Sequence, residues 1–440
     1  MVKLVRIIAR LNVGGPARHV VWATAGLREK FDSLLVTGTV PPEEDDMGYF
    51  AENHGVKPIV IPQMSREISL KDAFTIWKLF RLFLRERPDI VHTHTAKAGT
   101  AGRVAGIAYK WLTPSILIGR PRRCRFVHTY HGHVFHSYYG KLKTRVFLGI
   151  EKSLARLVTD CIVVISPQQF EEINGDFGVG RSEQFRVIPL GLDLESFSNS
   201  RNRRNRLRGE LSAGESDVLI GIVGRLTEIK NHLLFIEAAA RWKQAYSGQN
   251  RTVRFLVIGD GKLREELSEN ARRLGVDDIV EFLGTRNDPE YFYPALDVVA
   301  LTSLNEGTPL TLIEAMANER PCIATSVGGV IDLIGRETRH DEGTSFRICE
   351  RGILAPSGDS TALCEGFQRL IEDTGLREEL GARGGEFALS SFSKARLLSD
   401  LERLYNEMMG LGATQESMPP DSGPPSEVAP SELKRQVLDS

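Results

Sequence analysis

Short apolar runs alternate with longer amphipathic stretches along almost the whole chain, and this alternation limits the folds open to it more than any other feature. Such runs are typical of strands buried in a parallel sheet, and the stretches between them have the length and periodicity of helices. The first series of predicted strands comprises Leu4–Ala9, Ser33–Thr37, Pro58–Ile61, Ile90–His92, Phe126–Tyr130, Cys161–Ile165 and Arg186–Ile188. The second comprises Val218–Val223, Val253–Ile258, Ile279–Leu283, Val298–Leu301, Pro321–Thr325 and Gly352–Leu354. The pattern predicts an α/β fold of two doubly wound, Rossmann-like domains, with helices such as His19–Lys30 and Leu70–Glu86 between the strands.

The predicted domains are separated where the apolar pattern stops. Residues 1–196 form the first domain, residues 197–215 a basic linker with five arginines between Arg201 and Arg208, and residues 216–392 the second domain. Residues 393–410 are predicted to form a C-terminal helix, and residues 411–440, with five prolines and five serines, a disordered tail. Two such domains facing each other place the carboxyl ends of both sheets around one cleft, where open α/β sheets bind ligands.

Composition and missing motifs exclude several classes of protein. A formal charge of −1 gives no reason to expect nucleic-acid binding. Five cysteines without Cys-x-x-Cys spacing argue against a disulfide framework or a structural zinc site, and favour a reducing compartment. The N-terminus is predicted to be a strand rather than a signal peptide, and no apolar run approaches the roughly 18 to 20 residues of a membrane span, so we expect a cytoplasmic protein. The sequence also lacks a Gly-x-Gly-x-x-Gly motif, which counts against a nicotinamide or flavin enzyme. It has no Asp-x-Asp pair for a divalent ion on a nucleotide diphosphate, and no Gly-x-Ser-x-Gly motif of an α/β-hydrolase.

The stretch Asn305–Glu314 combines a predicted helix start with two carboxylates. Thr308 is predicted to be the N-cap and Pro309 the first helical residue, because the N–H that proline lacks has no intrahelical partner at that position. The free amides of the first turn form a positive end that suits phosphate oxygens. Glu306 precedes the cap and Glu314 lies in the second turn, so we expect both acids to flank the anion site and to bind hydroxyl groups there.

Glycine turns follow the first strand of each predicted domain. Gly14 and Gly15 could bring backbone amides to a phosphate or sugar, and the alternative is a tight turn without a ligand. The turn Gly224–Asn231 carries Arg225 and Lys230, two cations that could hold the phosphates of a diphosphate through charge-assisted hydrogen bonds. A solvated surface pair is the alternative for these two side chains.

Histidines gather at the ends of two first-domain strands. Four lie within residues 128–136, but a glycine interrupts the extended segment and no carboxylate or cysteine is close in sequence, which argues against a metal site. His131, at a strand end, is instead placed to hydrogen-bond a substrate hydroxyl. His94 and Lys97 follow a second strand on the same rim. Lys97 could meet an anionic acceptor, and a solvated lysine is the alternative.

Together these residues resemble the retaining glycosyltransferases of family 4, also called glycosyl transferases group 1, which have the two-domain GT-B fold. The resemblance covers about residues 3–409 and rests on Glu306 with Glu314, Arg225 with Lys230, Gly14 with Gly15, and His131. It also implies that the last helix returns to the first domain, which binds the acceptor.

The resemblance implies a role for each site residue. The implied donor-binding residues are Gly15, Arg225, Lys230, Gly307, Thr308, Pro309, Leu310 and Glu314. Arg225 and Lys230 would bind the donor diphosphate, and Glu314 the ribose hydroxyls. Glu306 and His131 are the implied catalytic residues, the first holding the donor sugar and the second lying at the reacting centre. We place His94 and Lys97 on the acceptor side.

The sequence therefore predicts a retaining hexosyltransferase that uses a nucleotide-diphosphate sugar, with a UDP-sugar favoured, and needs no cofactor or metal. The acceptor is predicted to be a hydroxyl of a lipid-linked or growing surface glycan, because Thr129–Phe135 resembles family members that build bacterial surface polysaccharides. Lys141–Lys152 and Arg120–Arg125 are basic and apolar enough to contact an anionic membrane at its inner face. A helix packed on its own domain is the alternative for Lys141–Lys152.

Three other functions remain open at this stage. A UDP-sugar 2-epimerase would share the two-domain form, and a non-catalytic nucleotide-sugar sensor would require a broken catalytic set. A nicotinamide dehydrogenase is weakened by the missing glycine fingerprint.

Overall fold

The computed structural model describes residues 1–12, 14–41, 46–64, 71–112, 114–132, 141–197, 203–246, 252–339 and 341–411 of the 440. Parts of several predicted features lie outside these ranges: residues 412–440 of the tail, residues 198–202 of the linker, residues 133–135 of the polysaccharide-type segment, and Leu70 of the predicted helix Leu70–Glu86. By its internal contacts the chain divides into residues 1–402 and residues 403–440.

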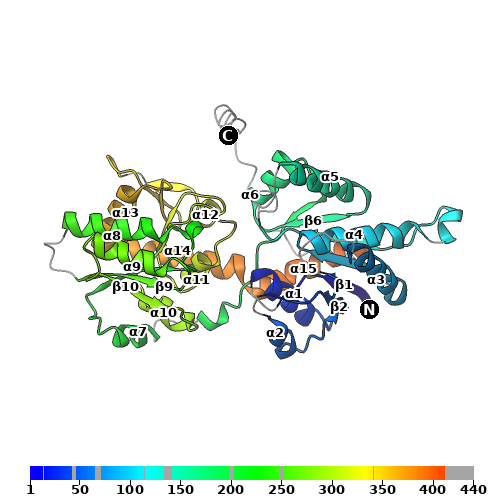
Figure 1. Ribbon diagram of the computed structural model, residues 1–440, viewed down its shortest axis with the longest axis horizontal. Helices are drawn as coiled ribbons and strands as arrows, with labels where there is room; N and C mark the ends of the chain where they lie inside the picture. The colour runs from blue at the N-terminus through cyan, green and yellow to red at the C-terminus, as the bar shows by residue number, and fades with distance from the viewer. Residues whose placement is uncertain are drawn as a thin grey trace. The chain divides into compact units, whose positions relative to one another are not determined.

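The first sheet has seven parallel strands in the order β3-β2-β1-β4-β5-β6-β7. They are β1 (Val2–Ile7), β2 (Phe31–Thr37), β3 (Ile59–Val60), β4 (Ile90–His94), β5 (Arg125–Thr129), β6 (Cys161–Val164) and β7 (Phe185–Val187). The helical elements between and after them are α1 (Gly15–Gly26), α2 (Gly48–Asn53), α3 (Lys71–Glu86), α4 (Ala96–Trp111), η1 (Pro114–Ile118), α5 (Lys141–Leu157), α6 (Pro167–Phe170), η2 (Glu171–Asp176), η3 (Ser182–Gln184) and η4 (Glu195–Phe197). The strand order reverses between β1 and β4. Figure 1 labels β1, β2 and β6 of this sheet.

The second sheet has eight strands in the order β10-β9-β8-β11-β12-β15-β14-β13, and reverses between β8 and β11. They are β8 (Val218–Val223), β9 (Val253–Ile258), β10 (Val280–Gly284), β11 (Val298–Leu301), β12 (Cys322–Thr325), β13 (Glu337–Arg339), β14 (Arg347–Cys349) and β15 (Gly352–Ala355). The helical elements are α7 (Arg204–Glu210), η6 (Glu228–Lys230), α8 (His232–Tyr246), α9 (Arg264–Arg273), α10 (Pro289–Ala295), α11 (Leu310–Ala317), α12 (Val330–Ile334), α13 (Ser360–Glu372), α14 (Thr374–Phe392) and α15 (Lys394–Met409).

Both faces of each sheet are buried, which explains why the strands are apolar runs rather than alternating ones. In β8, Ile220 and Ile222 pack in one core cluster with residues of α8 and α13, whereas Leu219 packs in another with residues of α10 and α11. These four helices are labelled in Figure 1. In the first sheet, Val5 packs with residues of α3 and α4, and Leu35 with residues of α1 and α2.

The thirteen predicted strands are present, with ends that differ by no more than two residues. β13 and β14 were missed, because they are three-residue antiparallel strands at the sheet edge and the β13 side chains are exposed. The predicted helix His19–Lys30 was wrong in its bounds. Helix α1 starts at the glycine turn itself, with Pro16 in its first turn, and it ends at Gly26.

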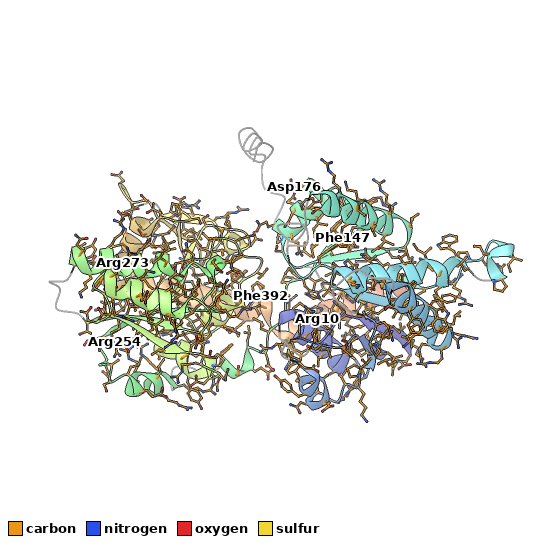
Figure 2. The ribbon with its side chains drawn as sticks, viewed as in Figure 1. Arg10, Phe147, Asp176, Arg254, Arg273 and Phe392 are labelled. Carbon is orange, nitrogen blue, oxygen red and sulfur yellow. The ribbon has the colours of Figure 1, made fainter. Side chains whose placement is uncertain are left out.

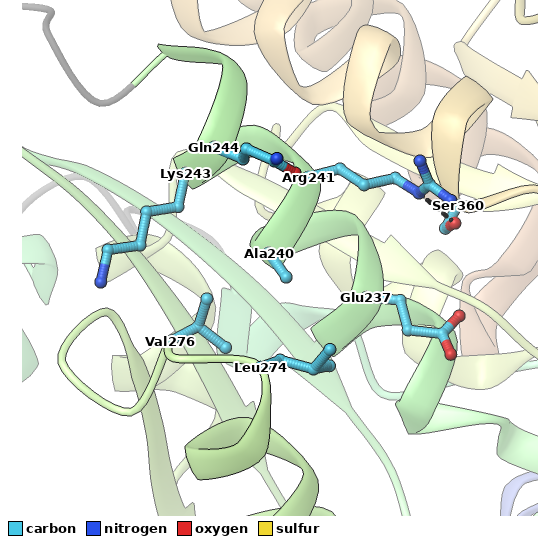
Figure 3. A pocket seen from close by; sticks show the side chains of 8 residues that line it. All are labelled: Glu237, Ala240, Arg241, Lys243, Gln244, Leu274, Val276 and Ser360. Carbon is cyan, nitrogen blue, oxygen red and sulfur yellow. Dashed lines mark hydrogen bonds between the residues drawn. The ribbon is translucent and has the colours of Figure 1, made fainter.

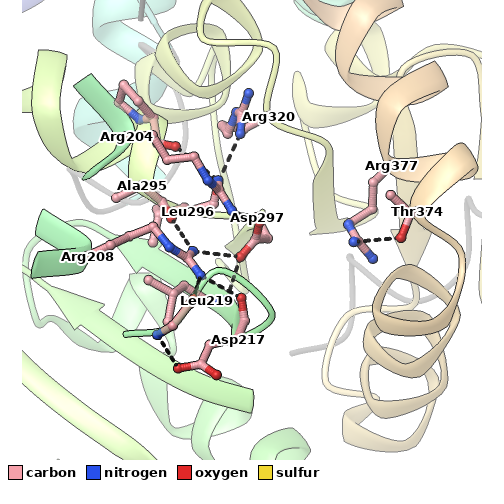
Figure 4. A network of polar contacts seen from close by, with 12 residues as sticks. Arg204, Arg208, Asp217, Leu219, Ala295, Leu296, Asp297, Arg320, Thr374 and Arg377 are labelled. Carbon is pink, nitrogen blue, oxygen red and sulfur yellow. Dashed lines mark hydrogen bonds and ion pairs between the residues drawn. The ribbon is translucent and has the colours of Figure 1, made fainter. Parts of the chain in front are cut away.

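Arginines of the predicted basic linker bind the second domain (Figure 4). The Asp297 carboxylate accepts from Arg204 at 2.6 Å, from Arg208 at 3.2 Å and from the Leu219 amide at 2.8 Å. Arg208 is buried and also donates to the carbonyl oxygens of Ala295, Gly214 and Asp217. These two guanidinium groups therefore satisfy backbone and carboxylate acceptors of the second domain rather than forming a free basic surface.

Only Ser393 separates helix α15 from Phe392, the last residue of α14 (Figure 2). The Leu192 amide donates to the Phe392 carbonyl at 2.7 Å, and the Lys394 amide donates to the Leu192 carbonyl at 2.8 Å. A Cβ added at Gly26 of α1 would lie 2.5 Å from the Leu398 side chain, so glycine allows close packing there. The first half of α15 thus contacts α1 and the segment after β7. Among the described helices, none has the length and apolarity needed to cross a membrane.

Candidate active site

The predicted donor residues of the second domain lie where its strand order reverses. Arg225 and Lys230 follow β8, and Glu306 follows β11, the neighbouring strand. Loops at the carboxyl ends of strands on either side of such a reversal turn in opposite directions, and open α/β sheets bind their ligands in the space left between them. The topology therefore places these cations and this carboxylate at the expected ligand position.

Lys230 and Glu306 form an ion pair across this position. The Lys230 Nζ lies 2.5 Å from Glu306 Oε1, and the two side chains are 25% and 12% exposed. The same oxygen accepts from Ser303 Oγ at 2.6 Å. Asn231, directly after Lys230, has φ 47°, a left-handed conformation that asparagine tolerates better than most residues. The solvated-pair alternative is therefore wrong for Lys230, while Arg225 is exposed on the preceding turn.

Backbone contacts join the turn after β8 to the loop after β11. Thr302 Oγ1 donates to the carbonyl oxygens of Lys230 and Asn231 at 3.1 and 2.9 Å, and the Leu304 amide donates to the Ile229 carbonyl at 2.8 Å. Thr325, at the end of β12, donates to the Ser303 carbonyl at 2.7 Å. Three strand ends therefore hold the loop that carries Glu306.

Two glycines after β12 close the other side of this loop. A Cβ added to Gly328 would lie 2.0 Å from the Glu306 carbonyl oxygen, and one added to Gly329 would lie 1.7 Å from that of Gly307. The Gly329 amide also donates to the Glu306 carbonyl at 3.1 Å. Any side chain at either position would displace Glu306 and Gly307. The sequence analysis missed this pair, although two adjacent glycines three residues after the end of a predicted strand were a visible signal.

The predicted start of the helix after Glu306 was wrong by one residue. Helix α11 begins at Leu310, and its N-cap is Pro309, with φ −71°, ψ 110° and no side-chain cap hydrogen bond. Thr308 is not the cap, because the preceding backbone is already fixed by its close contact with Gly329. The first amides of α11 still lack intrahelical partners, which keeps a positive helix end at Leu310 and Thr311.

Glu314 lies in the second turn of α11, as predicted, and has a partner that the sequence did not indicate. The Tyr293 hydroxyl donates to Glu314 Oε2 at 2.9 Å. Burial raises the pKa of Glu314, and the hydrogen bond from Tyr293 opposes this rise. The bond holds one oxygen of the Glu314 carboxylate in place.

In the first domain, three histidines meet where that sheet reverses. His19 lies in α1 after β1, His94 is the last residue of β4, and His131 lies two residues beyond β5. His94 Nδ1 and His131 Nε2 are 2.9 Å apart, and the His19 ring centroid lies 5.4 Å from that of His94 and 5.0 Å from that of His131. Burial lowers the pKa of His131 to about 4, and also lowers the pKa values of His19 and His94 well below their ordinary value. All three rings are therefore neutral near pH 7.

His19 was missed by the sequence analysis. It lies in the first turns of the helix that follows the Gly14-Gly15 turn, and this position was the signal that could have identified it. One ring nitrogen from each of the three histidines lies within 4.8 Å of the others, which makes them a candidate metal-ligand group among the described residues. Gly14 is the N-cap of α1, and Gly15 is the first residue of this helix.

A buried polar network fixes the end of β5 next to His131. The Glu151 carboxylate accepts two hydrogen bonds from Arg103 Nη2, both at 2.7 Å, and one from the Tyr130 hydroxyl at 2.6 Å. The Arg103 and Glu151 side chains are fully buried. Tyr130 directly precedes His131, so this network constrains the backbone from which the His131 ring extends.

After β4, Thr95 has a strained backbone and Lys97 forms an ion pair. Thr95, next to His94, has φ 65° and ψ 154°, a conformation that is nearly restricted to glycine and costs about 1 to 3 kcal/mol. Strain of this kind is concentrated at functional sites. The Lys97 ammonium lies 2.9 Å from Asp72 Oδ1, and its side chain is mostly buried, so the solvated-lysine alternative is wrong.

A surface hollow lies elsewhere in the second domain. It is formed between α8, the end of α9 and the start of α13, where Arg241 Nε donates to Ser360 Oγ at 2.7 Å (Figure 3). None of the predicted site residues lines it. The hollow is polar and open, and its chemistry does not match that of the loops around Lys230.

Comparisons with known proteins identify the family of the chain. Residues 13–196 match the family model described as Glycosyltransferase Family 4, and residues 217–373 match Glycosyl transferases group 1. The chain is 32% identical over 317 residues, 70% of this chain and 75% of the relative, to UDP-Gal:alpha-D-GlcNAc-diphosphoundecaprenol alpha-1,3-galactosyltransferase of Escherichia coli. It is 27% identical over 357 residues, 80% of this chain and 85% of the relative, to the capsular polysaccharide biosynthesis glycosyltransferase CapM of Staphylococcus aureus. Among solved structures, Anabaena Alr3699/HepE in complex with UDP has a TM-score of 0.72 and 21% identity, over 92% of this chain and 100% of that one.

Proposed function

The chain belongs to the family 4 glycosyltransferases, and we propose that it transfers a hexose from a UDP-sugar to a hydroxyl of a lipid-linked or growing surface glycan, with retention of configuration. The observation that carries this proposal is the Lys230–Glu306 pair, held where the second sheet reverses. A paired ammonium and carboxylate offer one group to a phosphate and the other to a sugar hydroxyl. UDP occurs in the names of both the Escherichia coli relative and the HepE complex, which supports the choice of nucleotide.

In the proposed reaction, the bond between the sugar and the diphosphate breaks and negative charge develops on the leaving phosphate. Lys230, Arg225 and the first amides of α11 stabilise that charge electrostatically, so no metal or cofactor is required at the diphosphate. Glu306 holds the donor sugar and Glu314 binds the ribose hydroxyls, while Tyr293 keeps the Glu314 carboxylate in place.

The acceptor hydroxyl attacks from the side of the leaving group and forms the new glycosidic bond, and its proton passes to the leaving phosphate. His131 contributes from the first domain as a neutral imidazole that hydrogen-bonds a sugar hydroxyl at the reacting centre. His94 is a positioning residue, because its ring nitrogen lies 2.9 Å from that of His131. Lys97 neighbours this rim, and its ion pair with Asp72 fixes the start of α4.

The first experiment identifies the donor. A thermal-shift screen against a panel of nucleotide sugars reports binding by mass action without an acceptor, and we expect the largest stabilisation from a UDP-sugar. Release of UDP, with and without added lipid-linked acceptors, then measures transfer. Stabilisation by no member of the panel would contradict the proposed donor site.

Variants of Lys230 and Glu306, with a variant of another lysine as the control, test the roles of these two residues. Lys230→Met and Glu306→Gln are each expected to lower kcat/KM by about 10² to 10³, the effect of losing one preorganised electrostatic contact. Lys262→Met is the control, because Lys262 is also paired, at 2.8 Å from Glu228, but is exposed on the turn after β9. Normal turnover in Lys230→Met would overturn the assignment.

Transfer itself is favoured over the alternatives, because the relatives named above are transferases rather than epimerases, sensors or dehydrogenases. Detection of sugar attached to an added acceptor, rather than an altered free UDP-sugar, distinguishes the transferase from the 2-epimerase.

The proposed acceptor brings the enzyme to the cytoplasmic face of a membrane by peripheral contact. Leu112, just after α4, and Ile118, at the end of η1, are 73% and 70% exposed, and the exposed Arg120 and Arg123 lie two and five residues after Ile118. Exposed apolar side chains beside cations suit an anionic lipid surface. Co-sedimentation at low salt with phosphatidylglycerol vesicles, compared with phosphatidylcholine vesicles, tests this contact. We expect Leu112→Ser with Arg120→Ser to lose it, and no binding by the unmodified protein would refute it.

A further inference from the structure

Helix α3 presents a stacked aromatic pair on its exposed face. Phe74 and Trp77 are 45% and 49% exposed, and their rings lie with centroids 5.4 Å apart and planes inclined by 21°. The opposite face of the helix packs in the first-domain core through residues such as Leu79 and Phe83. Single exposed apolar side chains are common on protein surfaces, whereas adjoining ones indicate an interaction site.

Two cations border this aromatic pair. Lys78 Nζ lies 4.9 Å from the centroid of the Phe74 ring, and the Arg81 guanidinium carbon lies 5.4 Å from that of the Trp77 ring. Lys78 also donates to Gln63 Oε1 at 3.0 Å, which is a neutral acceptor. Within the described parts of the chain, neither cation forms an ion pair with a carboxylate. These four side chains, Phe74, Trp77, Lys78 and Arg81, are called the α3 platform below.

The start of α3 is attached to the rim of the proposed reacting centre. Asp72 Oδ1 lies 2.9 Å from Lys97 Nζ, and Lys97 follows His94, the last residue of β4, by three positions. A helix rises about 1.5 Å per residue, so Trp77 lies about 7.5 Å and Arg81 about 13.5 Å along the helix axis from Asp72. One extended acceptor molecule can therefore contact both the reacting centre and the platform.

We propose that the α3 platform binds the diphosphate link and the adjoining hydrocarbon chain of a lipid-linked acceptor. This inference rests on the proposed function, because it names the part of the acceptor that the first domain recognises. Lys78 and Arg81 donate charge-assisted hydrogen bonds to the phosphate oxygens. Phe74 and Trp77 cover the first carbons of the chain, so that apolar surface meets apolar surface directly beside the charges.

Charge and position favour this occupant over a free glycan or the bilayer. A neutral glycan offers nothing to two cations that lack carboxylate partners. The residues proposed to meet the bilayer, Leu112 and Ile118, lie beyond the last residue of α4, and the 16 residues of that helix span about 24 Å. Helices α3 and α4 pack side by side (Figure 1), and their first turns are joined by the Asp72–Lys97 pair. The platform is thus near the reacting centre and distant from that bilayer contact.

Tryptophan fluorescence of the full chain tests the binding without any sugar transfer. A Trp111→Phe background leaves Trp77 as the exposed tryptophan, because Trp22 and Trp242 are each 5% exposed. The probe is farnesyl diphosphate, which carries both a diphosphate and a short chain, added with UDP in excess to occupy the donor site. We expect saturable binding and a shift of the Trp77 emission to shorter wavelength, because the chain excludes water from the ring. Inorganic pyrophosphate lacks the chain and is expected to cause no shift.

Variants locate the bound probe. Lys78→Gln and Arg81→Gln are each expected to weaken the binding of farnesyl diphosphate by about tenfold, because each removes one charge-assisted contact. Arg85→Gln is the matched control, because Arg85 lies one turn further along α3, is 67% exposed and pairs with Glu86 at 2.7 Å. In transfer assays, Arg81→Gln is expected to raise the KM for a lipid-linked acceptor, with the KM for the UDP-sugar and kcat unchanged.

The outcomes separate this proposal from the proposed function. The platform assignment is overturned by the absence of saturable farnesyl diphosphate binding, or by unchanged binding in both glutamine variants. It is also overturned if both variants lose binding to phosphatidylglycerol vesicles, because the exposed face of α3 would then be a bilayer contact. Failure of the proposed function is a different result: no sugar would be transferred to any lipid-linked acceptor, whatever the α3 variants bind.

Discussion

Replacing Glu151 by glutamine would remove the charge at the centre of the buried network beside His131. The change keeps the size of the side chain but puts an amide where the Arg103 guanidinium now finds a carboxylate. It leaves Arg103 fully buried with its charge uncompensated. The Tyr130 hydroxyl, 2.6 Å from Oε2, also loses a charged acceptor.

The expected loss of stability follows from these contacts. Glu151 receives two bonds from Arg103 Nη2 and one from Tyr130, and a hydrogen bond to a charged group contributes about 1.5 to 3 kcal/mol. Breaking one side of a buried ion pair costs about 3 to 5 kcal/mol, because the remaining charge stays desolvated. We therefore expect Glu151→Gln to lower the free energy of unfolding of the first domain by about 4 kcal/mol.

Urea unfolding followed by tryptophan fluorescence measures this loss. Trp22, Trp77 and Trp111 lie in the first domain and Trp242 in the second, so a Trp242→Phe background restricts the signal to the first. With an m value of about 2 kcal/mol/M, the midpoint should fall by about 2 M.

A triple variant separates the loss of a partner from the value of the network itself. Glu151→Leu with Arg103→Met and Tyr130→Phe removes the carboxylate, the guanidinium and the phenol hydroxyl together, and apolar replacement of a buried pair is often neutral or stabilising. We expect this variant to recover most of the stability lost in Glu151→Gln. A loss below about 1 kcal/mol in the single variant would refute the reasoning, because the carboxylate would then not be compensating a buried charge.

Three further predictions concern the second domain. Glu314→Gln is expected to raise the KM for the donor about tenfold with kcat little changed, as for a contact made equally in the ground and transition states; a fall in kcat alone would contradict the ribose role. Asp297→Asn is expected to lower the free energy of unfolding by about 3 kcal/mol, measurable by urea unfolding, because Arg208 is buried against it. Burial, with a contribution from nearby Lys230, lowers the pKa of His232 to about 4, so between about pH 6.5 and pH 4 the unfolded chain binds a proton that the folded chain does not. Stability is therefore lost as pH falls through this window, by about 3 kcal/mol in total, and His232→Gln should show a correspondingly shallower loss in urea unfolding at pH 7 and pH 4.5.

The fold was predictable because buried parallel strands are apolar on both faces. β8, β9 and β11 were located at their observed ends, whereas the exposed edge strand β13 offered no apolar run to detect. Helix α11 started later than predicted, because backbone packing rather than a side-chain cap sets its first turn.

The sequence predicted where the site lies better than it predicted which residues form it. Strand ends pointed to Lys230, Glu306 and His131, but their partners come from segments far apart in sequence. Tyr293 could be assigned only once the structure was known, because it lies 21 residues before its partner Glu314 in the chain. The ion pair of Lys97 with Asp72 joins two helices in the same way.

The hydrogen bonds that join the turn after β8 to the loop after β11 also limit how donor preference can be transplanted between homologous enzymes. Thr302 and Leu304 bond to the backbone of residues 229–231, and Gly328 and Gly329 pack directly on the Glu306 loop. A chimera with a crossover between these segments would combine surfaces that were never matched. Recombination should therefore exchange residues 224–231, 302–309 and 328–329 from one parent as a single unit.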